Sequence, residues 1–356
     1  MEISELGEFG LIERLAKEIT SKNATTVKGI GDDCAILAPS EGMRTLVTTD
    51  LLMEGVHFDL TYVPLRHLGY KAVMVNLSDV FAMNAQPRQL TVSLAISSKF
   101  QVEDIEELYA GMRMACEKWG VDIVGGDTTA SLTGLAISIT VIGAARSEDI
   151  VLRSGAKPTD LICVSGNLGA AYMGLQLLER EKVIYNEQVE QARKSGSKEQ
   201  MEALREAQPD FSGREYILER QLKPEARGDI IEALHKAGIH PTSMMDISDG
   251  LSSELMHICK QSQTGCRIYE ERLPLDYQTA AMAEELNLNV STCALNGGED
   301  YELLFTVPLS LNDTVSALED IHVIGYITEA DKGCALITRD GGEHVLKAQG
   351  WNPLKT

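Results

Sequence analysis

The sequence predicts a two-domain protein of mixed α+β and α/β class, and three observations support this. The chain has 356 residues, which is more than a single hydrophobic core usually organises. Strand-like and helix-like patterns of apolar residues interleave in both halves. Between the halves, Arg153–Asp160 (RSGAKPTD) interrupts the apolar pattern with glycine, proline and polar residues, so we expect domains at residues 1–150 and 151–356.

The elements of the first half follow from the spacing of its apolar residues. Short β-branched or alternating runs predict strands, and apolar residues at helical spacing predict helices. The strands expected are Thr45–Asp50, Gln89–Ser97, Val121–Val124 and Leu135–Ala144, and the helices are His67–Ala85 and Glu103–Trp119. The first helix is expected to stop before Gln86-Pro87, since proline cannot continue it.

The pattern restarts in the second half. Leu161–Ser165 predicts a strand, followed by a glycine turn and a helix from about Ala170. Glu179–Gly213 is charged and poor in large apolar residues, which predicts a solvated helical excursion on the surface. The remaining elements expected are helices near Gly228–Ala237 and Ser252–Gln261 and strands near Arg267–Tyr269, Tyr301–Val307 and His322–Ile327.

Charge and cysteine content narrow the classes of function. The formal net charge of −21 disfavours a nucleic-acid partner, because phosphates would be repelled. No apolar run approaches the ~20 residues that span a bilayer. Seven cysteines are scattered without a C-x-x-C pair, which favours reduced thiols and a cytoplasmic location. Cys34, Cys163 and Cys259 stand in apolar runs, and we interpret them as packing residues.

Acidic residues recur where strands or turns end, beside glycine or a hydroxyl residue. Mg²⁺ prefers hard oxygen ligands and usually bridges one or two carboxylates to substrate phosphates. Taken alone, a segment is better explained as a helix cap, as at Asp249-Gly250, or as a turn, as at Gly125-Gly126-Asp127. Six of them together favour carboxylates that converge on several magnesium ions. The segments are Gly29–Leu37, Thr45–Leu52, Val75–Met83, Asp122–Thr129, Met244–Leu255 and Leu295–Phe305.

Spacing within these segments predicts which groups act together. Asn76 and Asp79 lie three residues apart on a predicted helix and therefore share a face. Asp246 and Asp249 flank a strand-to-helix turn, where Ser248 and the helix N-terminus suit a phosphate. Thr48 and Thr49 precede Asp50 and offer further oxygens. The chain has no G-x-x-x-x-G-K-[ST] loop, which excludes a P-loop kinase.

These segments, taken together, resemble the thiamine-monophosphate kinase family, whose superfamily includes aminoimidazole ribonucleotide synthetase. They follow the family's order and cover most of the chain. The matching stretches are Gly7–Ile12 (GEFGLI), Gly29–Leu37 (GIGDDCAIL), Thr48–Phe58 (TTDLLMEGVHF), Tyr70–Pro87, Val124–Thr129 (VGGDTT), Leu152–Asp160, Asp246–Leu251 (DISDGL) and Asn296–Pro308 (NGGEDYELLFTVP).

The resemblance implies a fold and a reaction. The N-terminal domain would join its sheet to that of a second copy in a barrel-like layer of a homodimer, and the C-terminal domain would be a mixed sheet flanked by helices. ATP and thiamine monophosphate would give ADP and thiamine diphosphate, the final step of thiamine diphosphate biosynthesis. Several Mg²⁺ ions would assist direct in-line phosphoryl transfer to a substrate phosphate that is already ionised, so no general base is expected.

The resemblance also implies roles for individual residues. Asp79 and Asp127, from different elements, would meet at the metals. The magnesium ligands would be Asp33, Thr48, Thr49, Asp50, Asp79, Asp127, Asp246 and Asp249. The residues at ATP would be Tyr109, Gly126, Asp127, Arg153 and Ser248. The residues at thiamine monophosphate would be His57, Glu299 and Trp351.

The sequence departs from the family pattern in two places, and two alternative functions remain to be considered. The tail reads Gly350-Trp351-Asn352-Pro353-Leu354 where the family commonly has Gly-aromatic-Asp-His-Phe, and Glu179–Gly213 is longer and more charged than the family leads us to expect. One rival is a sister ATP-dependent synthetase that acts on a ribonucleotide amide or on selenide. The other is a non-catalytic regulator that binds Mg²⁺ and nucleotide on the same scaffold.

Overall fold

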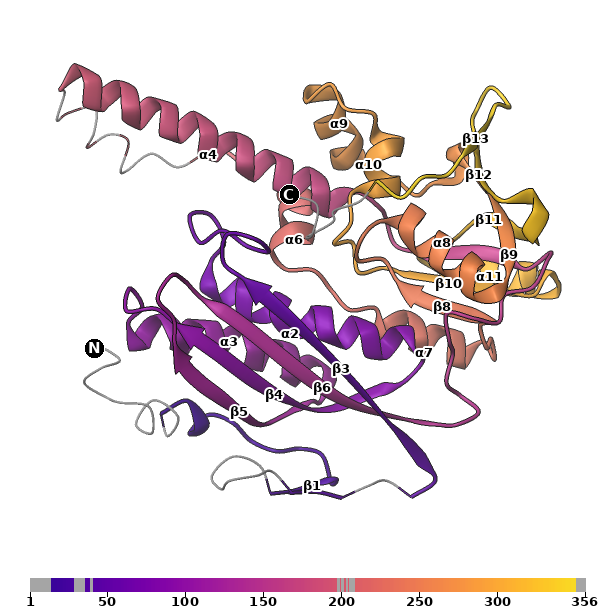
Figure 1. The fold of residues 1–356 in the computed structure, drawn as a ribbon, viewed down its shortest axis with the longest axis horizontal. Helices are drawn as coiled ribbons and strands as arrows, with labels where there is room; N and C mark the ends of the chain where they lie inside the picture. The colour runs from indigo at the N-terminus through magenta and orange to yellow at the C-terminus, as the bar shows by residue number, and fades with distance from the viewer. Residues whose placement is uncertain are drawn as a thin grey trace.

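The computed structural model describes residues 14–28, 36–38, 41–196, 199, 202, 204 and 209–349. Two sheets divide this part of the chain, one formed by residues 43–146 and one by residues 161–345, and the fold is two-domain-like (Figure 1). A small two-stranded ladder, β1 (Thr26–Lys28) with β2 (Ile36–Leu37), lies beside the first sheet.

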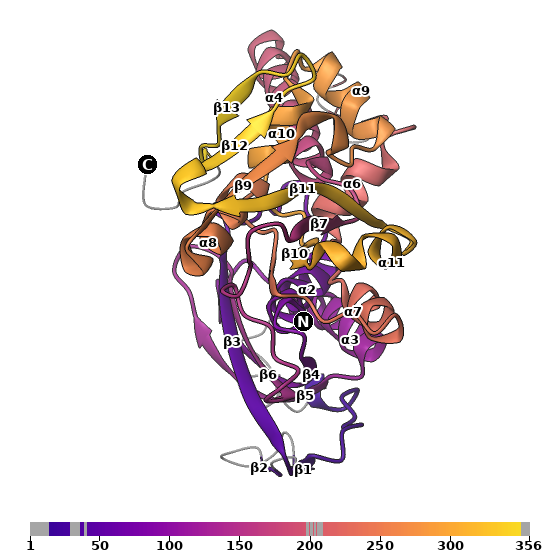
Figure 2. The same cartoon turned by 90° about the vertical axis from the view of Figure 1, so that its right-hand side faces the viewer.

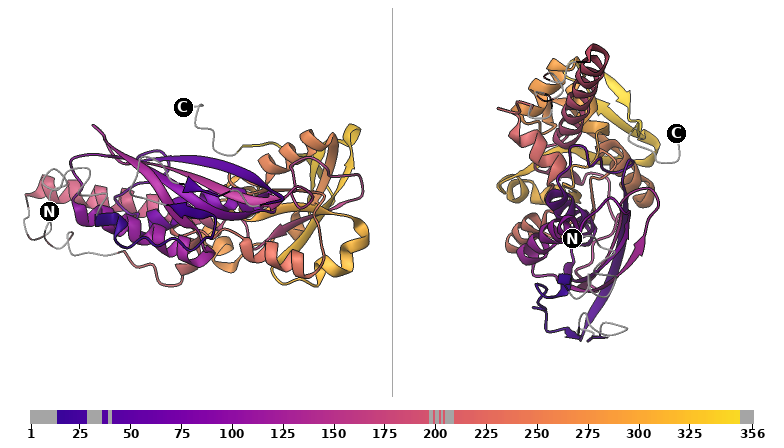
Figure 3. Two further views of the ribbon diagram at one scale, coloured as in Figure 1. Left: turned by 90° about the horizontal axis from the view of Figure 1, so that it is seen from below. Right: turned by 90° about the vertical axis from the view of Figure 1, so that its left-hand side faces the viewer.

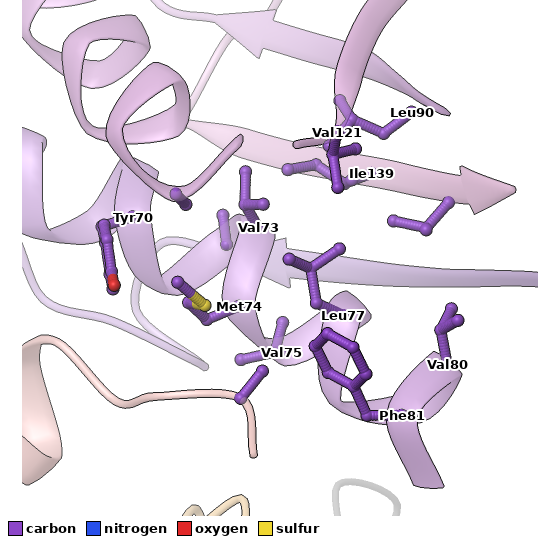
Figure 4. Packing of buried hydrophobic residues seen from close by; sticks show 14 of the residues in the cluster. Tyr70, Val73, Met74, Val75, Leu77, Val80, Phe81, Leu90, Val121 and Ile139 are labelled. Carbon is purple, nitrogen blue, oxygen red and sulfur yellow. The ribbon is translucent and has the colours of Figure 1, made fainter. Parts of the chain in front are cut away.

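The first sheet has four strands in the order β3-β6-β4-β5. Only β4 and β5 run parallel, and the other neighbours are antiparallel. The strands are β3 (Met43–Met53), β4 (Gln86–Ile96), β5 (Asp122–Ala130) and β6 (Ala136–Arg146), and the helices beside them are α2 (Leu65–Ala82) and α3 (Val102–Trp119). Buried side chains of α2 such as Val73 and Leu77 pack against Leu90 and Ile139 of the sheet (Figure 4).

Two glycines allow α2 and α3 to touch backbone to backbone. A Cβ placed on Gly69 would lie 1.9 Å from the Leu108 carbonyl oxygen, and one on Gly111 would lie 1.8 Å from that of Arg66. No side chain fits such a contact, so glycine is required at both positions. Because α2 is packed between α3 and the sheet, it is buried along almost its whole length from Leu68 to Ala82. This fixes the helix that carries Asn76 and Asp79.

The second sheet is mixed and has seven strands in the order β13-β12-β9-β11-β7-β10-β8. Only β12 and β9 run parallel. The strands are β7 (Leu161–Ser165), β8 (Ser243–Asp246), β9 (Thr264–Tyr269), β10 (Leu303–Val307), β11 (Ile321–Glu329), β12 (Cys334–Ile337) and β13 (Glu343–Val345). The helices around it are α6 (Glu215–Leu222), α7 (Gly228–Lys236), α8 (Leu251–Ser262), α9 (Tyr277–Glu285), α10 (Val290–Asn296) and α11 (Asn312–Ser316).

Helix α4 (Ala170–Ser195) starts within the second half of the fold and extends outward above the first sheet (Figures 1 and 3). Near its middle, Glu179 accepts a 2.6 Å hydrogen bond from the Tyr62 hydroxyl, and Lys182 forms a 2.5 Å ion pair with Asp59. Beyond these contacts its side chains are mostly exposed. The helical excursion expected from the charged segment is therefore confirmed as far as Ser195.

Helices α2 and α3 cover one face of the four-stranded sheet, and the other face is open (Figure 2). On β3, Val47 is 66% exposed and Leu51 is 56% exposed, although both are large apolar residues. The sheet ends at β3 on one side and β5 on the other, so the described residues of one chain form no closed barrel. The barrel-like layer is therefore not a property of the single chain.

Most expected elements are confirmed, with shifts at their ends. The strand expected at Val121–Val124 continues through Gly125 and Gly126 to Ala130, because β4 supplies hydrogen-bonding partners along its length. The strand expected from Tyr301 begins at Leu303. Sequence patterns did not predict α6, α9, α10, α11, β12 or β13, which are short. In the part of the chain described, the helices are too short or too polar to cross a membrane.

Candidate active site

Strand β3 and helix α2 bring the first group of predicted residues together. The Thr48 hydroxyl donates to the Asp79 carboxylate, and the backbone N–H of Asp50 donates a 3.0 Å hydrogen bond to the Asn76 side-chain oxygen. Asn76 is fully buried and its amide is held by the Ala72 carbonyl, 3.0 Å away. The shared helix face predicted for Asn76 and Asp79 is thus confirmed, and that face is turned toward Thr48 and Asp50.

Thr49 points away from this group because successive strand residues face opposite sides of a sheet. Its hydroxyl donates to the Ile139 carbonyl at 3.1 Å and accepts from the Thr140 hydroxyl at 3.0 Å. Of the predicted neighbours of Asp50, only Thr48 therefore presents its side chain to Asp79. The Thr49 hydroxyl instead faces the other side of the sheet.

The second half of the fold contributes Asp246, at the end of β8. Its carboxylate accepts a 2.7 Å hydrogen bond from the Ser78 hydroxyl of α2, and both side chains are buried. Asp246 is on the edge strand of the seven-stranded sheet, which is the edge nearest to α2. We call Asp50, Asp79 and Asp246 the aspartate group.

The aspartate group carries negative charge that the described residues only partly compensate. Burial and the neighbouring Asp79 raise the pKa of Asp50 to about 6. Burial also raises the pKa of Asp246, with Asp79 and Asp50 adding to the effect. For Asp79, burial raises the pKa against the opposing effects of the Thr48 hydrogen bond and the Arg153 charge. The carboxylates thus lie close enough to repel one another.

Two loops of the second half meet beside this group. The Glu299 N–H donates to the Ser248 carbonyl at 2.7 Å, and the Tyr301 N–H donates to the Ile247 carbonyl at 2.8 Å. A Cβ on Gly298 would lie 2.7 Å from the Ser248 carbonyl oxygen, so this close approach requires glycine. The two glycine-acid segments singled out in the sequence are therefore paired backbone to backbone.

Glu299 and Tyr301 adopt left-handed backbone conformations, with φ of 57° and 52°. Non-glycine residues in this conformation store strain of about 1–3 kcal/mol each and cluster at functional sites. Burial raises the pKa of Tyr301, and the carboxylates of Glu299, Asp246 and Asp50 add to this effect. Sequence reasoning missed Tyr301, which lies within electrostatic reach of these acidic residues.

A second polar group lies around Glu299. The Lys71 ammonium of α2 forms a 3.1 Å ion pair with Glu299, whose other oxygen accepts from the Gln221 amide at 3.2 Å. Lys71 is itself 4% exposed. Burial lowers the pKa of His57, the Glu299 charge raises it and the Lys71 charge lowers it. These effects place His57 near both charges. His57 and Glu299, which the resemblance placed at one substrate, do lie together, and Lys71 and Gln221 join them.

Other predicted residues take up different positions. Arg153 is exposed in the connection between β6 and β7 and lies within electrostatic reach of Asp79. Asp249 is exposed at the start of α8, where its N–H donates to Glu254 at 3.0 Å. Tyr109 is 8% exposed within the core on α3. Asp33 and Trp351 lie outside the described residues.

Asp127 and Gly126 lie apart from the aspartate group within one chain. Both are on β5, the edge strand opposite β3, and Asp127 is exposed. Three strand spacings separate β3 from β5, or about 14 Å. A Cβ on Gly126 would lie 1.9 Å from the Val92 carbonyl oxygen, which explains the glycine. Asp79 contacts β3 through Thr48, so no contact between Asp79 and Asp127 is seen in the described residues of one chain.

A cavity of about 420 Å³ lies elsewhere, between the end of α3 and the segment around Arg220 and Arg227. Its charged groups are already paired: Arg220 binds Glu302 at 2.8 Å, and Arg227 binds Glu302 and also Asp320 at 2.6 Å. Paired charges leave little capacity for a phosphate. The aspartate group, with its uncompensated charge, is the better candidate for a reactive site.

Comparison with known proteins agrees with the fold. Residues 31–145 match the model of the family "AIR synthase related protein, N-terminal domain". Residues 31–145 thus carry an AIR-synthase-related N-terminal domain. A thiamine-monophosphate kinase of Bacillus subtilis is 32% identical over 98% of this chain and 100% of its own, and one of Aquifex aeolicus is 35% identical over 93% and 94%.

A solved structure gives the same result. The structure of AaThiL complexed with AMPPCP and TMP has a TM-score of 0.72 and 33% identity, and the match covers 99% of this chain and 98% of that chain. The chain therefore belongs to the thiamine-monophosphate kinase family.

Proposed function

We propose that this chain transfers the γ-phosphoryl group of ATP to thiamine monophosphate, giving thiamine diphosphate and ADP, the last step in making that cofactor. The relatives named above carry the name of this activity, and AaThiL was crystallised with AMPPCP and TMP. The observation on this chain that carries the proposal is the aspartate group, in which Asp246 of β8 meets α2 and β3.

The donor set of this site fits magnesium. Asp50, Asp79 and Asp246 offer carboxylate oxygens whose raised pKa values reflect burial and mutual repulsion, which a divalent cation relieves. Among the described residues, no three carboxylates here come within 4.8 Å of one another. Each ion would therefore be held by one or two carboxylates, with water and phosphate oxygens completing its shell. When bound, the ions would offset the repulsion between the two anionic substrates.

The chain's own groups would position the phosphates. Arg153 offers a fixed positive charge close to Asp79, at the mouth of the site. The turn Ser248–Gly250 precedes α8, a helix of 12 residues whose N-terminus has no side-chain cap, and helix N-termini favour anions. We propose Ser248 and Arg153 as groups at ATP, with Tyr109 as a further member, and Asp249 and Asp33 as further magnesium ligands.

The second polar group would hold the thiamine substrate. His57, Glu299 and Lys71 lie together at the junction of the first sheet, α2 and the Gly298–Tyr301 loop. Glu299 suits the cationic ring system of thiamine, since its carboxylate can carry a negative charge. Lys71 would orient Glu299 through their ion pair. Trp351 remains a proposed contact from the family tail.

We further propose that two chains form the working enzyme. The open face of the four-stranded sheet exposes Val47 and Leu51, which a second copy would cover. A second copy would also supply Asp127 and Gly126, which are too far from Asp79 within one chain. The domain division at residues 150 and 151 fits the gap between β6, which ends at Arg146, and β7, which begins at Leu161. The six described cysteines are all unpaired, which supports a cytoplasmic location.

The decisive experiment is an assay of the purified full-length chain with ATP and Mg²⁺. Thiamine monophosphate should be converted to thiamine diphosphate, and unphosphorylated thiamine should be left essentially untouched, because the nucleophile is the existing phosphate. Aminoimidazole precursors serve as the control for a sister synthetase. Comparable turnover of thiamine and thiamine monophosphate, or turnover of the aminoimidazole precursors alone, would overturn the proposal.

A further inference from the structure

Three cysteines from distant parts of the chain meet in the second half of the fold. They are Cys259 on α8, Cys266 on β9 and Cys334 on β12, and their sulfur atoms all lie within 4.8 Å of one another. In the part of the chain described, no other three histidine, cysteine or acidic residues come as close together. We call these residues the thiol group.

The topology of the sheet explains the convergence. β9 and β12 are parallel neighbours, and Cys266 and Cys334 are partners in their register. Partners in register point to the same face, so their side chains lie next to each other. Helix α8 packs beside β9 and brings Cys259 to the same place (Figure 2). The arrangement is therefore held by three elements whose own packing fixes it.

The spacing of the sulfur atoms suits a bound metal ion. Metal–thiolate bonds are about 2.3 Å long, so three thiolates around one ion lie about 4 Å apart. The sulfur atoms of Cys259, Cys266 and Cys334 already lie within 4.8 Å of one another, which is close to this separation. Little rearrangement is therefore needed to close the group on an ion.

The donor set selects the class of ion. Thiolate ligands favour soft ions such as Cu(I) and Zn(II). Structural zinc almost always takes four ligands, and the thiol group has no fourth histidine, cysteine or carboxylate among the described residues. Cys259 and Cys266 are buried in the apolar cluster between the seven-stranded sheet and α8. A site of three sulfur ligands suits a monovalent soft ion better than a hard or four-coordinate one.

Charge and access favour binding as well. The Arg267 guanidinium follows Cys266 directly, is fixed by the Cys266 and Gly333 carbonyls at 2.8 and 2.9 Å, and acts electrostatically on Cys334. It would offset part of the negative charge that three thiolates bring. Cys334 is half-buried, which leaves an entry path.

We propose that Cys259, Cys266 and Cys334 form a three-thiolate binding site for a soft monovalent metal ion of the Cu(I) type. Binding would displace the thiol protons to solvent and would change no oxidation state. The site is separate from the phosphoryl-transfer site: β12 lies near one edge of the seven-stranded sheet, and β8 with Asp246 forms the other edge. The two proposals can therefore fail independently.

The test is an anaerobic titration of the reduced full-length chain with Cu(I), supplied as its acetonitrile complex in the presence of a competing colorimetric chelator. Wild type should capture one Cu(I) per chain, and its melting temperature should rise with the ion bound. Cys334→Ser should lower the affinity at least ~100-fold, because it removes a direct ligand. X-ray absorption of the loaded chain should show three sulfur neighbours.

Controls separate binding from folding. Cys293→Ser changes a buried cysteine of α10 outside the thiol group and should bind as wild type does. If Cys334→Ser melts early without metal, Cys334→Ala replaces it, since it adds no polar group. Absence of Cu(I) capture by wild type, or equal capture by the Cys334 variants, would overturn the site. Tighter capture of Zn(II) than of Cu(I) would overturn the class of ion.

Discussion

The Ser78 hydroxyl donates a 2.7 Å hydrogen bond to the carboxylate of Asp246, and this contact joins the two halves of the fold at the aspartate group. Ser78 lies on α2, which covers one face of the four-stranded sheet, whereas Asp246 is the last residue of β8 in the seven-stranded sheet. Both side chains are almost completely buried. The position of Asp246 relative to Asp79 therefore depends on this hydroxyl.

Replacement of Ser78 by alanine should lower both stability and turnover. The variant leaves a buried carboxylate without its donor, which costs about 1–3 kcal/mol. We expect a melting temperature several degrees lower and a reduced kcat, measured by thermal circular dichroism and the kinase assay. Ser97→Ala is the matched control, because Ser97 is also buried and its hydroxyl has no partner among the described residues. Equal effects of both changes would show that the Ser78 hydrogen bond does not matter.

Asp79→Asn and Asp127→Asn should abolish most activity without unfolding the chain. Each removes one carboxylate while keeping its size, so kcat and kcat/KM should fall together, by ~10²–10³ for a lost contact in a preorganised site. Asp79→Asn should melt no earlier than wild type without magnesium, since it relieves repulsion within the aspartate group. A variant that melts early but turns over normally would remove its residue from the site.

Mixing the two inactive variants tests whether the site is shared between chains. If Asp79 of one chain works with Asp127 of a second, each mixed dimer regains one intact site. Random exchange of subunits should then restore about a quarter of wild-type turnover in a symmetric dimer. The control is each variant mixed with itself, which should stay inactive. Failure of the mixture to recover activity under conditions of proven exchange contradicts the shared site.

Asp300 should make stability fall as pH rises. This carboxylate is fully buried and accepts a 2.9 Å hydrogen bond from the Gly169 N–H, and burial raises its pKa to about 7. Its pKa in the unfolded chain is about 3.9. Between these two pH values the folded chain keeps a proton on Asp300 that the unfolded chain has lost. The contribution of this proton to the free energy of unfolding is complete below about pH 4 and is lost as the pH rises through about 7.

Asp300→Asn should flatten this dependence. The melting temperature, measured from pH 4.5 to 8 in EDTA, should fall less steeply with pH in the variant than in wild type. Asp313→Asn changes an exposed carboxylate and serves as the control. An unchanged slope in the Asp300 variant would show that Asp300 remains ionised throughout the range.

The outer part of the charged excursion should be dispensable. Replacing Asn186–Ala207 by a short Gly/Ser linker removes the end of α4 but keeps the contacts of Glu179 and Lys182 with the first half. Turnover should stay within a few-fold of wild type. Loss of turnover with an unchanged circular dichroism spectrum would instead show that the segment shapes the site.

A charge on the open sheet face should separate the two chains. Leu51→Asp places a carboxylate on β3 at a position that is 56% exposed in the single chain. Sedimentation should show a dimer for wild type and a monomer for this variant, with similar melting temperatures. Leu309→Asp is the matched control, because Leu309 is 57% exposed outside this face. A dimeric Leu51 variant would place the interface elsewhere.

The longer helices and strands were predictable from the sequence, because the spacing of their apolar residues repeats over several turns or strand positions. α3 and β7 were placed to within one residue, and α2 and β6 to within three. The glycine-acid segments were also visible, since glycine beside a carboxylate is a local pattern. The short elements α9, α10 and β12 were missed because a few residues carry too little periodic signal.

The contacts that build the site were not predictable in the same way. Ser78 and Asp246 are 168 residues apart, and no local pattern links them. Lys71 resembles a surface lysine in the sequence, but α2 is covered on nearly every side, so it is buried against Glu299. Cys259 was interpreted as a packing residue, because the register that joins Cys266 to Cys334 cannot be read from either strand alone.

The join between Ser78 and Asp246 has a consequence during synthesis of the protein. The ribosome releases β3 and α2, with Asp50 and Asp79, long before β8 and β10 are made. A nascent chain with only its first half outside the ribosome lacks Asp246 and the Gly298–Tyr301 loop, so its acidic site is incomplete. Because the proposed phosphoryl transfer uses residues from both halves, premature termination before Tyr301 would yield a fragment without ATP-consuming activity.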